Sequence, residues 1–205
     1  GGIEVRELTS SVANDDAGAD VDATPDKRSN VLERITHPEG FQHVAISMDG
    51  ERVALARPAS RIEVRRLGEL SESGVELELG PSLDRVEKMA FTLGGEVLLA
   101  SVIGAGGEET VRIYDVSEAR ELGRIAATDF AVREDGFLTI AAGQMLRRFQ
   151  VDESAGSARG VRSLELGVGH VMPPEQLQIM DGTSSILSTS RDGEVILWDL
   201  EKFGG

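Results

Sequence analysis

The sequence predicts an all-β fold assembled from several copies of one antiparallel strand unit. Short apolar segments rich in β-branched and aromatic residues alternate with glycine-containing turns along most of the chain. Segments of the same kind recur at spacings of 41 to 47 residues. The turns within them include two-residue hairpin signals, because Gly tolerates positive φ and Asp can bond its own backbone. These turns are Asp49-Gly50, Gly94-Gly95, Asp135-Gly136 and Asp181-Gly182.

The clearest unit is the last one, Gly169 to Leu200. It opens with Gly169-His170, and Asp181-Gly182 then leads into an apolar run from Ser184 to Ser190. A second turn, Asp192-Gly193, precedes the segment Val195 to Leu200, whose Val, Ile, Leu and Trp side chains favour a strand. The unit therefore predicts three antiparallel strands joined by tight turns.

Three earlier units repeat this order and add a fourth strand. In the first, Val44 to Ala56 holds two strands around a turn, Arg61 to Leu67 is the third and Gly74 to Leu79 the fourth. The next units start at Met89 and Phe130, and the last unit follows with Leu177 at the equivalent position. The spacings of 45, 41 and 47 residues agree with a repeated four-stranded sheet of about 40–45 residues.

The N-terminal region predicts an incomplete unit. Ile3 to Leu8 matches the third strand of a unit, and Val31 to Ile35 matches the fourth. The intervening segment, residues 9–30, is rich in Asp, Ser and Ala and has no aromatic residue, so it buries too little apolar surface to order itself. We expect it to be a mobile acidic loop.

A helical alternative exists at two places. Ser117 to Ile125 and Pro174 to Met180 have compositions that a short helix tolerates, the second with Pro near a first turn. Both segments are short, and each falls where the repeat predicts a strand or a connection. A short helix at Pro173-Pro174-Glu175 stays open at this stage.

Composition excludes several classes of protein. The chain of 205 residues has no Cys, which rules out disulfides, thiolate metal sites and cysteine nucleophiles. Its net charge of −15 argues against a nucleic-acid partner, since such partners require Lys and Arg to neutralise phosphates. No apolar run approaches the roughly 18 residues of a membrane helix. We expect an acidic cytoplasmic protein without a membrane partner.

The dipeptide Trp198-Asp199 after Gly169-His170, with Tyr114-Asp115 as a near equivalent, resembles the WD-repeat family of β-propellers. The resemblance implies a single domain, 1–205, built of about four to five four-stranded antiparallel blades. Blades are expected at residues 41–80, 84–126, 128–166 and 169–202, with a partial blade at 1–36. We expect these blades to form the C-terminal part of a larger ring. In a smaller closed ring, the last unit would instead take Val31 to Ile35 as its fourth strand.

The same resemblance implies a buried hydrogen-bonded set of His170, Ser188, Asp192 and Trp198. A Ser, a His and an Asp can also form a hydrolase triad, but no Gly-x-Ser-x-Gly sequence surrounds Ser188. The three histidines of the chain have no metal-binding spacing. We therefore expect a structural network and no catalytic residue, cofactor or metal.

What the resemblance implies about function is a non-catalytic scaffold for protein–protein interaction. Its partner would be another protein, or another segment of the same polypeptide that completes the propeller. The alternatives are a propeller that binds or hydrolyses a small molecule in its central channel, and a structural assembly subunit. Candidate partner-binding residues lie in loops expected to share one end of the propeller: His37, Phe41, Arg57, Arg61, Glu108, Met172 and Arg191.

Overall fold

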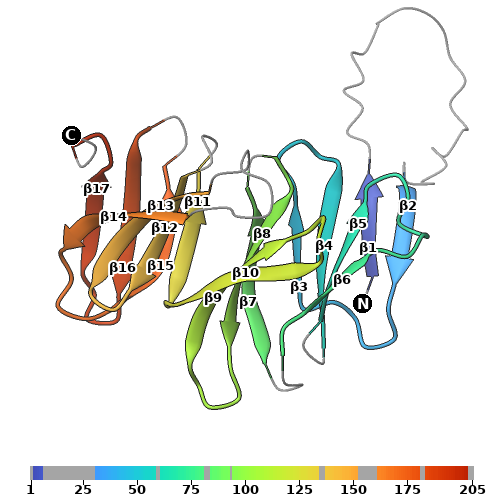
Figure 1. The fold of residues 1–205 in the computed structure, drawn as a ribbon, viewed down its shortest axis with the longest axis horizontal. Coiled ribbons are helices and arrows are strands. Elements are labelled where there is room, and N and C mark those ends of the chain that lie inside the picture. The colour runs from blue at the N-terminus through green and yellow to red at the C-terminus, as the bar shows by residue number, and fades with distance from the viewer. Residues whose placement is uncertain are drawn as a thin grey trace, which may run out of the picture.

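A computed structural model describes residues 2–6, 31–58, 61–80, 84–92, 94–133, 137–151, 161–180 and 183–202. These residues form 17 β-strands and no helix, as the all-β prediction requires (Figure 1). The segment predicted to be a mobile acidic loop, residues 9–30, lies outside the described residues.

Three four-stranded antiparallel sheets follow one another along the chain, and each keeps its strands in sequence order. The first contains β3 (His43–Ile46), β4 (Arg52–Arg57), β5 (Arg61–Arg66) and β6 (Val75–Glu78). The second contains β7 (Arg85–Phe91), β8 (Val97–Ile103), β9 (Glu109–Asp115) and β10 (Arg120–Ala126). The third contains β11 (Asp129–Val132), β12 (Phe137–Ala142), β13 (Met145–Val151) and β14 (Val161–Val168). The strands fall where the repeat predicted them.

Smaller sheets stand at both ends of this row. A two-stranded sheet pairs β1 (Gly2–Arg6) with β2 (Val31–Thr36). A three-stranded sheet contains β15 (Pro174–Ile179), β16 (Ser185–Ser190) and β17 (Val195–Asp199). Figure 1 shows these two sheets at opposite ends of the long axis of the molecule. Since β2 pairs with β1 and not with β17, the described strands do not form the small closed ring.

Both segments of the helical alternative are strands. Arg120–Ala126 pairs with β9, and Pro174–Ile179 pairs with β16. The short helix considered at Pro173-Pro174-Glu175 was therefore wrong, because β15 already begins at Pro174. A proline is tolerated at the first residue of a strand, where its missing N–H interrupts no run of ladder bonds.

The sheets pack face to face in chain order, with an apolar layer between each pair. In β8 the side chains alternate between two layers: Leu98, Ala100 and Val102 join the layer shared with the first sheet. Val97 and Leu99 join the layer shared with the third sheet. A strand buried on both faces needs an unbroken apolar run rather than alternation, which is what the sequence Val-Leu-Leu-Ala-Ser-Val-Ile provides.

Two further layers complete the row. Ala141, Leu146, Leu177 and Trp198 belong to the layer between the third and last sheets. A smaller layer, which includes Val53, Leu55 and Leu70 with Ile35 packed against them, lies between the first four-stranded sheet and β1–β2.

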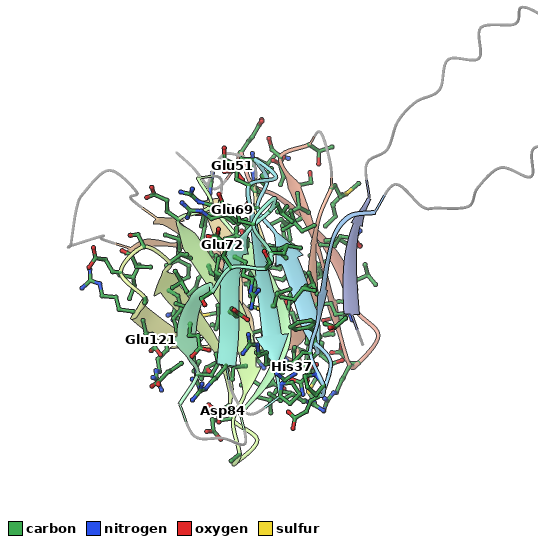
Figure 2. All side chains as sticks on the ribbon, turned by 90° about the vertical axis from the view of Figure 1, so that its right-hand side faces the viewer. His37, Glu51, Glu69, Glu72, Asp84 and Glu121 are labelled. Carbon is green, nitrogen blue, oxygen red and sulfur yellow. The ribbon has the colours of Figure 1, made fainter. Side chains whose placement is uncertain are left out.

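Antiparallel order places successive connections at opposite ends of the sheets. Figure 2 shows His37 and Asp84 at one end and Glu51, Glu69 and Glu72 at the other. The first end, here the His37 end, carries the connections that precede the first strand of each sheet and those between its second and third strands. The remaining connections form the Glu51 end. This separation matches the expected grouping of the candidate partner-binding loops.

We predict that Leu98→Ala destabilises the protein by about 2–5 kcal/mol, because it leaves a cavity between two sheets. Leu98 is fully buried, with 0% of its surface exposed. Urea unfolding followed by circular dichroism measures the change. The control is Glu72→Ala at an exposed turn, expected to change stability by less than about 0.5 kcal/mol. Equal midpoints for the two variants would contradict packing between the sheets.

Candidate interaction site

Three of the four residues of the predicted buried network are joined by hydrogen bonds. Trp198 Nε1 donates to Ser188 Oγ at 2.6 Å, and Ser188 Oγ lies 2.6 Å from His170 Nε2. Ser188 Oγ accepts from the indole N–H and also bonds to the imidazole Nε2, so that one hydroxyl joins both rings. All three side chains are buried. Gly169 lies against the indole so closely that a Cβ there would clash with Trp198 Cη2.

Asp192, the fourth predicted member, serves the adjacent turn. Its carboxylate accepts hydrogen bonds from Ser190 Oγ and from the Glu194 backbone N–H. The Ser190 bond is the main reason why the pKa of Asp192 lies below its ordinary value. The carboxylate oxygen near His170 Nδ1 belongs to Glu194, at 3.4 Å.

The same turn occurs at Ser47-Met48-Asp49-Gly50. There Ser47 Oγ donates to Asp49, the Glu51 N–H donates to the same carboxylate, and the pKa of Asp49 is lowered, first of all by the Ser47 bond. Asp192 is thus held by the local geometry of a Ser-x-Asp-Gly turn, which competes with the imidazole for its oxygens.

We predict that Ser188→Ala lowers stability by about 2–4 kcal/mol, because it leaves two buried nitrogen atoms without partners. Trp198 is the only Trp in the sequence, so its fluorescence during urea unfolding reports on this sheet directly. Ser73→Ala, in an exposed turn, is the matched control and is expected to unfold like the wild type. A Ser188→Ala midpoint equal to that of Ser73→Ala would mean that the network contributes no stability.

The candidate partner-binding residues do not form one continuous surface. His37 and Phe41 lie against each other, with ring centroids 5.9 Å apart. Arg57 forms an ion pair with the buried Glu63, and Arg61 Nη1 lies 3.2 Å from Glu76 Oε2. Glu108 folds over its own glycine loop, because a Cβ on Gly104 would meet its carboxylate. Met172 and Arg191, in contrast, line a common groove.

This groove has a volume of about 690 Å³ and lies at the His37 end. Ile103 and Glu109, which flank the β8–β9 connection, line one part of it. Met172, Pro173 and Glu175, around the start of β15, line another. Thr128 and Asp129, at the start of β11, belong to the sheet that stands between these two in the row.

Connection lengths explain why a groove forms at this place. The β8–β9 and β14–β15 connections, residues 104–108 and 169–173, have five residues each. In the third sheet, the two connections at the same end, residues 127–128 and 143–144, have only two each. The middle sheet therefore stands lower than its neighbours at the His37 end, and the difference leaves a groove between the longer loops.

Polar contacts fix the three sheets relative to one another along the groove. Lys88 Nζ, from β7, lies 2.9 and 3.2 Å from the two Asp129 oxygens and 2.6 Å from the Phe130 carbonyl oxygen. The Leu177 N–H, from β15, donates to Asp129 Oδ2 at 2.7 Å. Neither Lys88 nor Asp129 was predicted from the sequence as a site residue. An Asp directly before an apolar strand was visible, but its Lys partner stands 41 residues away.

Exposed apolar side chains lie on the first four-stranded sheet and on the last sheet. On β3 and its following turn, Val44, Ile46 and Met48 are 43%, 57% and 51% exposed, although the alternate residues Ala45 and Ser47 are buried. On β17, Val195 and Leu197 are 60% and 59% exposed, whereas Trp198 is buried. β3 and β17 thus each carry exposed apolar side chains on one face.

Several kinds of site have no support in the described residues. No group of three or more His, Asp or Glu side chains there is placed to hold a metal ion. In the same part of the chain, no helix has the length and apolar character needed to cross a membrane.

Burial raises the pKa of the Tyr114 hydroxyl to about 12, so that this core side chain stays neutral at ordinary pH.

No protein-family model matches the chain, and no curated protein matches it either. Its function is therefore inferred from the arrangement of its own residues.

Proposed function

We propose that this chain is a WD-repeat-like β-propeller segment that acts as a non-catalytic protein-interaction scaffold. Four sheets of the same strand order packed in sequence support the proposal, as does the His170–Ser188–Trp198 network. The absence of Cys from the sequence agrees with a reducing compartment, and we assign the scaffold to the cytoplasm.

The observation that carries the proposal is the exposure of apolar side chains on β3 of the first four-stranded sheet and on β17 of the last sheet. Monomeric proteins rarely leave contiguous apolar patches exposed unless these bind something. Val44 and Ile46 stand on the same face of the first four-stranded sheet as Val53 and Leu55, which pack against the β1–β2 sheet. Ile46 and Met48 also line a pocket beside the first strands of the second, third and last sheets. Val195 and Leu197 stand on the face of β17 directed away from the third sheet. The β17 face thus lacks a neighbouring sheet, and the β3 face has only the two-stranded sheet β1–β2 beside it.

Strand order defines what would fill the gap. In the repeat, β1 and β2 correspond to the third and fourth strands of a sheet, and β15–β17 correspond to the first, second and third. A segment that completes the ring must therefore supply a fourth strand to the last sheet, and a first and a second strand to the sheet that contains β1 and β2. Any whole sheets would stand between these two. A second copy of the chain can cover a bare face but cannot complete the ring, because its β1 would place a third strand where a fourth is needed. The partner is a different β-rich segment, from another protein or from the same polypeptide.

The remaining surface would then present binding loops on a rigid body. The second and third sheets are buried on both faces, so their loops at the His37 end are held by elements that do not rearrange easily. In the groove, Lys88 is neutralised by Asp129 and Arg191 by Glu175. Charged groups paired in this way support binding rather than acid–base catalysis.

We predict that the 205-residue chain self-associates through the exposed apolar faces of β3 and β17, and that Val195→Lys/Leu197→Lys shifts it toward the monomer. Light scattering coupled to size exclusion, over a range of concentrations, measures the mass. The unfolding midpoint should be unchanged, because both side chains are already exposed. Glu69→Gln/Glu72→Gln is the matched control, with the same change in net charge at the exposed Glu51 end.

Two results would oppose this proposal. The first is a wild-type chain that stays monomeric at every concentration. The second is an equal response of both double variants, which would assign the effect to net charge rather than to the β17 face.

A further inference from the structure

We propose that the groove at the His37 end binds an extended peptide segment in which a Lys or Arg stands next to an apolar residue. This inference rests on the proposed scaffold function and names the chemistry of its partner. The residues that line the groove belong to the second, third and last sheets, all of which the structure describes.

The charges of the groove favour a basic occupant. Its two cations are each neutralised within the groove: Lys88 by Asp129, and Arg191 by an ion pair with Glu175. Two further acids, Glu87 and Glu109, also line it. Glu87 has an exposed neighbour, Arg85, whereas no described side chain forms an ion pair with the Glu109 carboxylate. The groove therefore carries an acidic surplus centred on Glu109.

Apolar side chains also line the groove and favour an occupant that carries an apolar group beside its positive charge. Ile103 flanks Glu109 at the end of β8, and Met172, with 45% of its surface exposed, and Pro173 also line the groove. Met adapts its shape to different apolar partners. A volume of about 690 Å³ falls in the range of pockets that enclose several side chains.

The groove is already formed without a ligand. Thr128 Oγ1 donates to the Pro174 carbonyl oxygen, and Asp129 accepts from both Lys88 and the Leu177 N–H. These bonds tie the start of β11 to β7 and β15, so binding orders little of the protein. The net charge of −15 would also steer a basic peptide toward the molecule, which makes the association rate dependent on salt.

The test is fluorescence anisotropy with three fluorescein-labelled octapeptides that alternate Leu with Arg, Gly with Arg, or Leu with Glu. We expect the Leu–Arg peptide to bind, the Gly–Arg peptide to bind more weakly, and the Leu–Glu peptide not to bind. Glu109→Arg should weaken binding of the Leu–Arg peptide roughly fivefold to tenfold, because it replaces an attraction by a repulsion. Glu72→Arg, the same charge change at the opposite end, should alter it less than about twofold.

A second variant tests the apolar part. Met172→Ser should weaken binding of the Leu–Arg peptide and leave binding of the Gly–Arg peptide unchanged. The inference is overturned if the Gly–Arg peptide binds as tightly as the Leu–Arg peptide, if Glu72→Arg matches Glu109→Arg, or if no peptide binds.

The binding assay is repeated on Val195→Lys/Leu197→Lys, which separates the two proposals. Peptide binding without any self-association by the wild-type chain would leave the groove standing and remove the argument from the exposed faces of β3 and β17. Self-association without peptide binding would do the reverse.

Discussion

The constraint on which the structure depends is that its central sheets are apolar on both faces. In β8, Leu98 and Val102 face one neighbouring sheet while Val97 and Leu99 face the other, and all are fully buried. Such a sheet is stable only between two others, so the stability of each unit depends on the next. The same rule explains the ends: a row built from two-faced units cannot stop without leaving a face bare, as Val195 and Leu197 do.

Apolar packing is non-directional, and polar contacts supply the alignment that it lacks. Asp129 is buried and uses both carboxylate oxygens, one toward Lys88 and one toward both Lys88 and the Leu177 N–H. A buried carboxylate is costly unless it is fully partnered, so a shift of one sheet against another would leave it unpaired. Ser188 has the same role within the last sheet, where it links strand β16 to Trp198 and to the His170 loop. These contacts specify one arrangement among several that would bury similar area.

The repeat in the sequence was sufficient to locate the strands, because two-residue turns and apolar runs are local signals. The repeat was not sufficient where the structure depends on a particular pairing that the repeat does not show. Pro174 begins a strand because β16 is available to pair with it, and the sequence near Pro174 does not show that. Asp192 was placed with His170, but Ser190, two residues away, takes its carboxylate. The groove was missed for a related reason: its residues come from three sheets, and only the packing order shows that their loops are neighbours.

The sheets of this chain are constrained by packing on both faces, whereas the loop residues that connect them are not. A change in a buried strand residue such as Leu98 disturbs two sheets at once, whereas loop residues 104–108 and 171–173 contribute no side chain to the apolar layers. Their length and charge can therefore vary while the row of sheets keeps its geometry. A difference of three residues between neighbouring connections is enough to open the groove. One acid that lines it, Glu109, makes the net charge of the groove negative. Binding specificity in this architecture is thus set by loop length and loop charge, on a body whose stability those loops hardly affect.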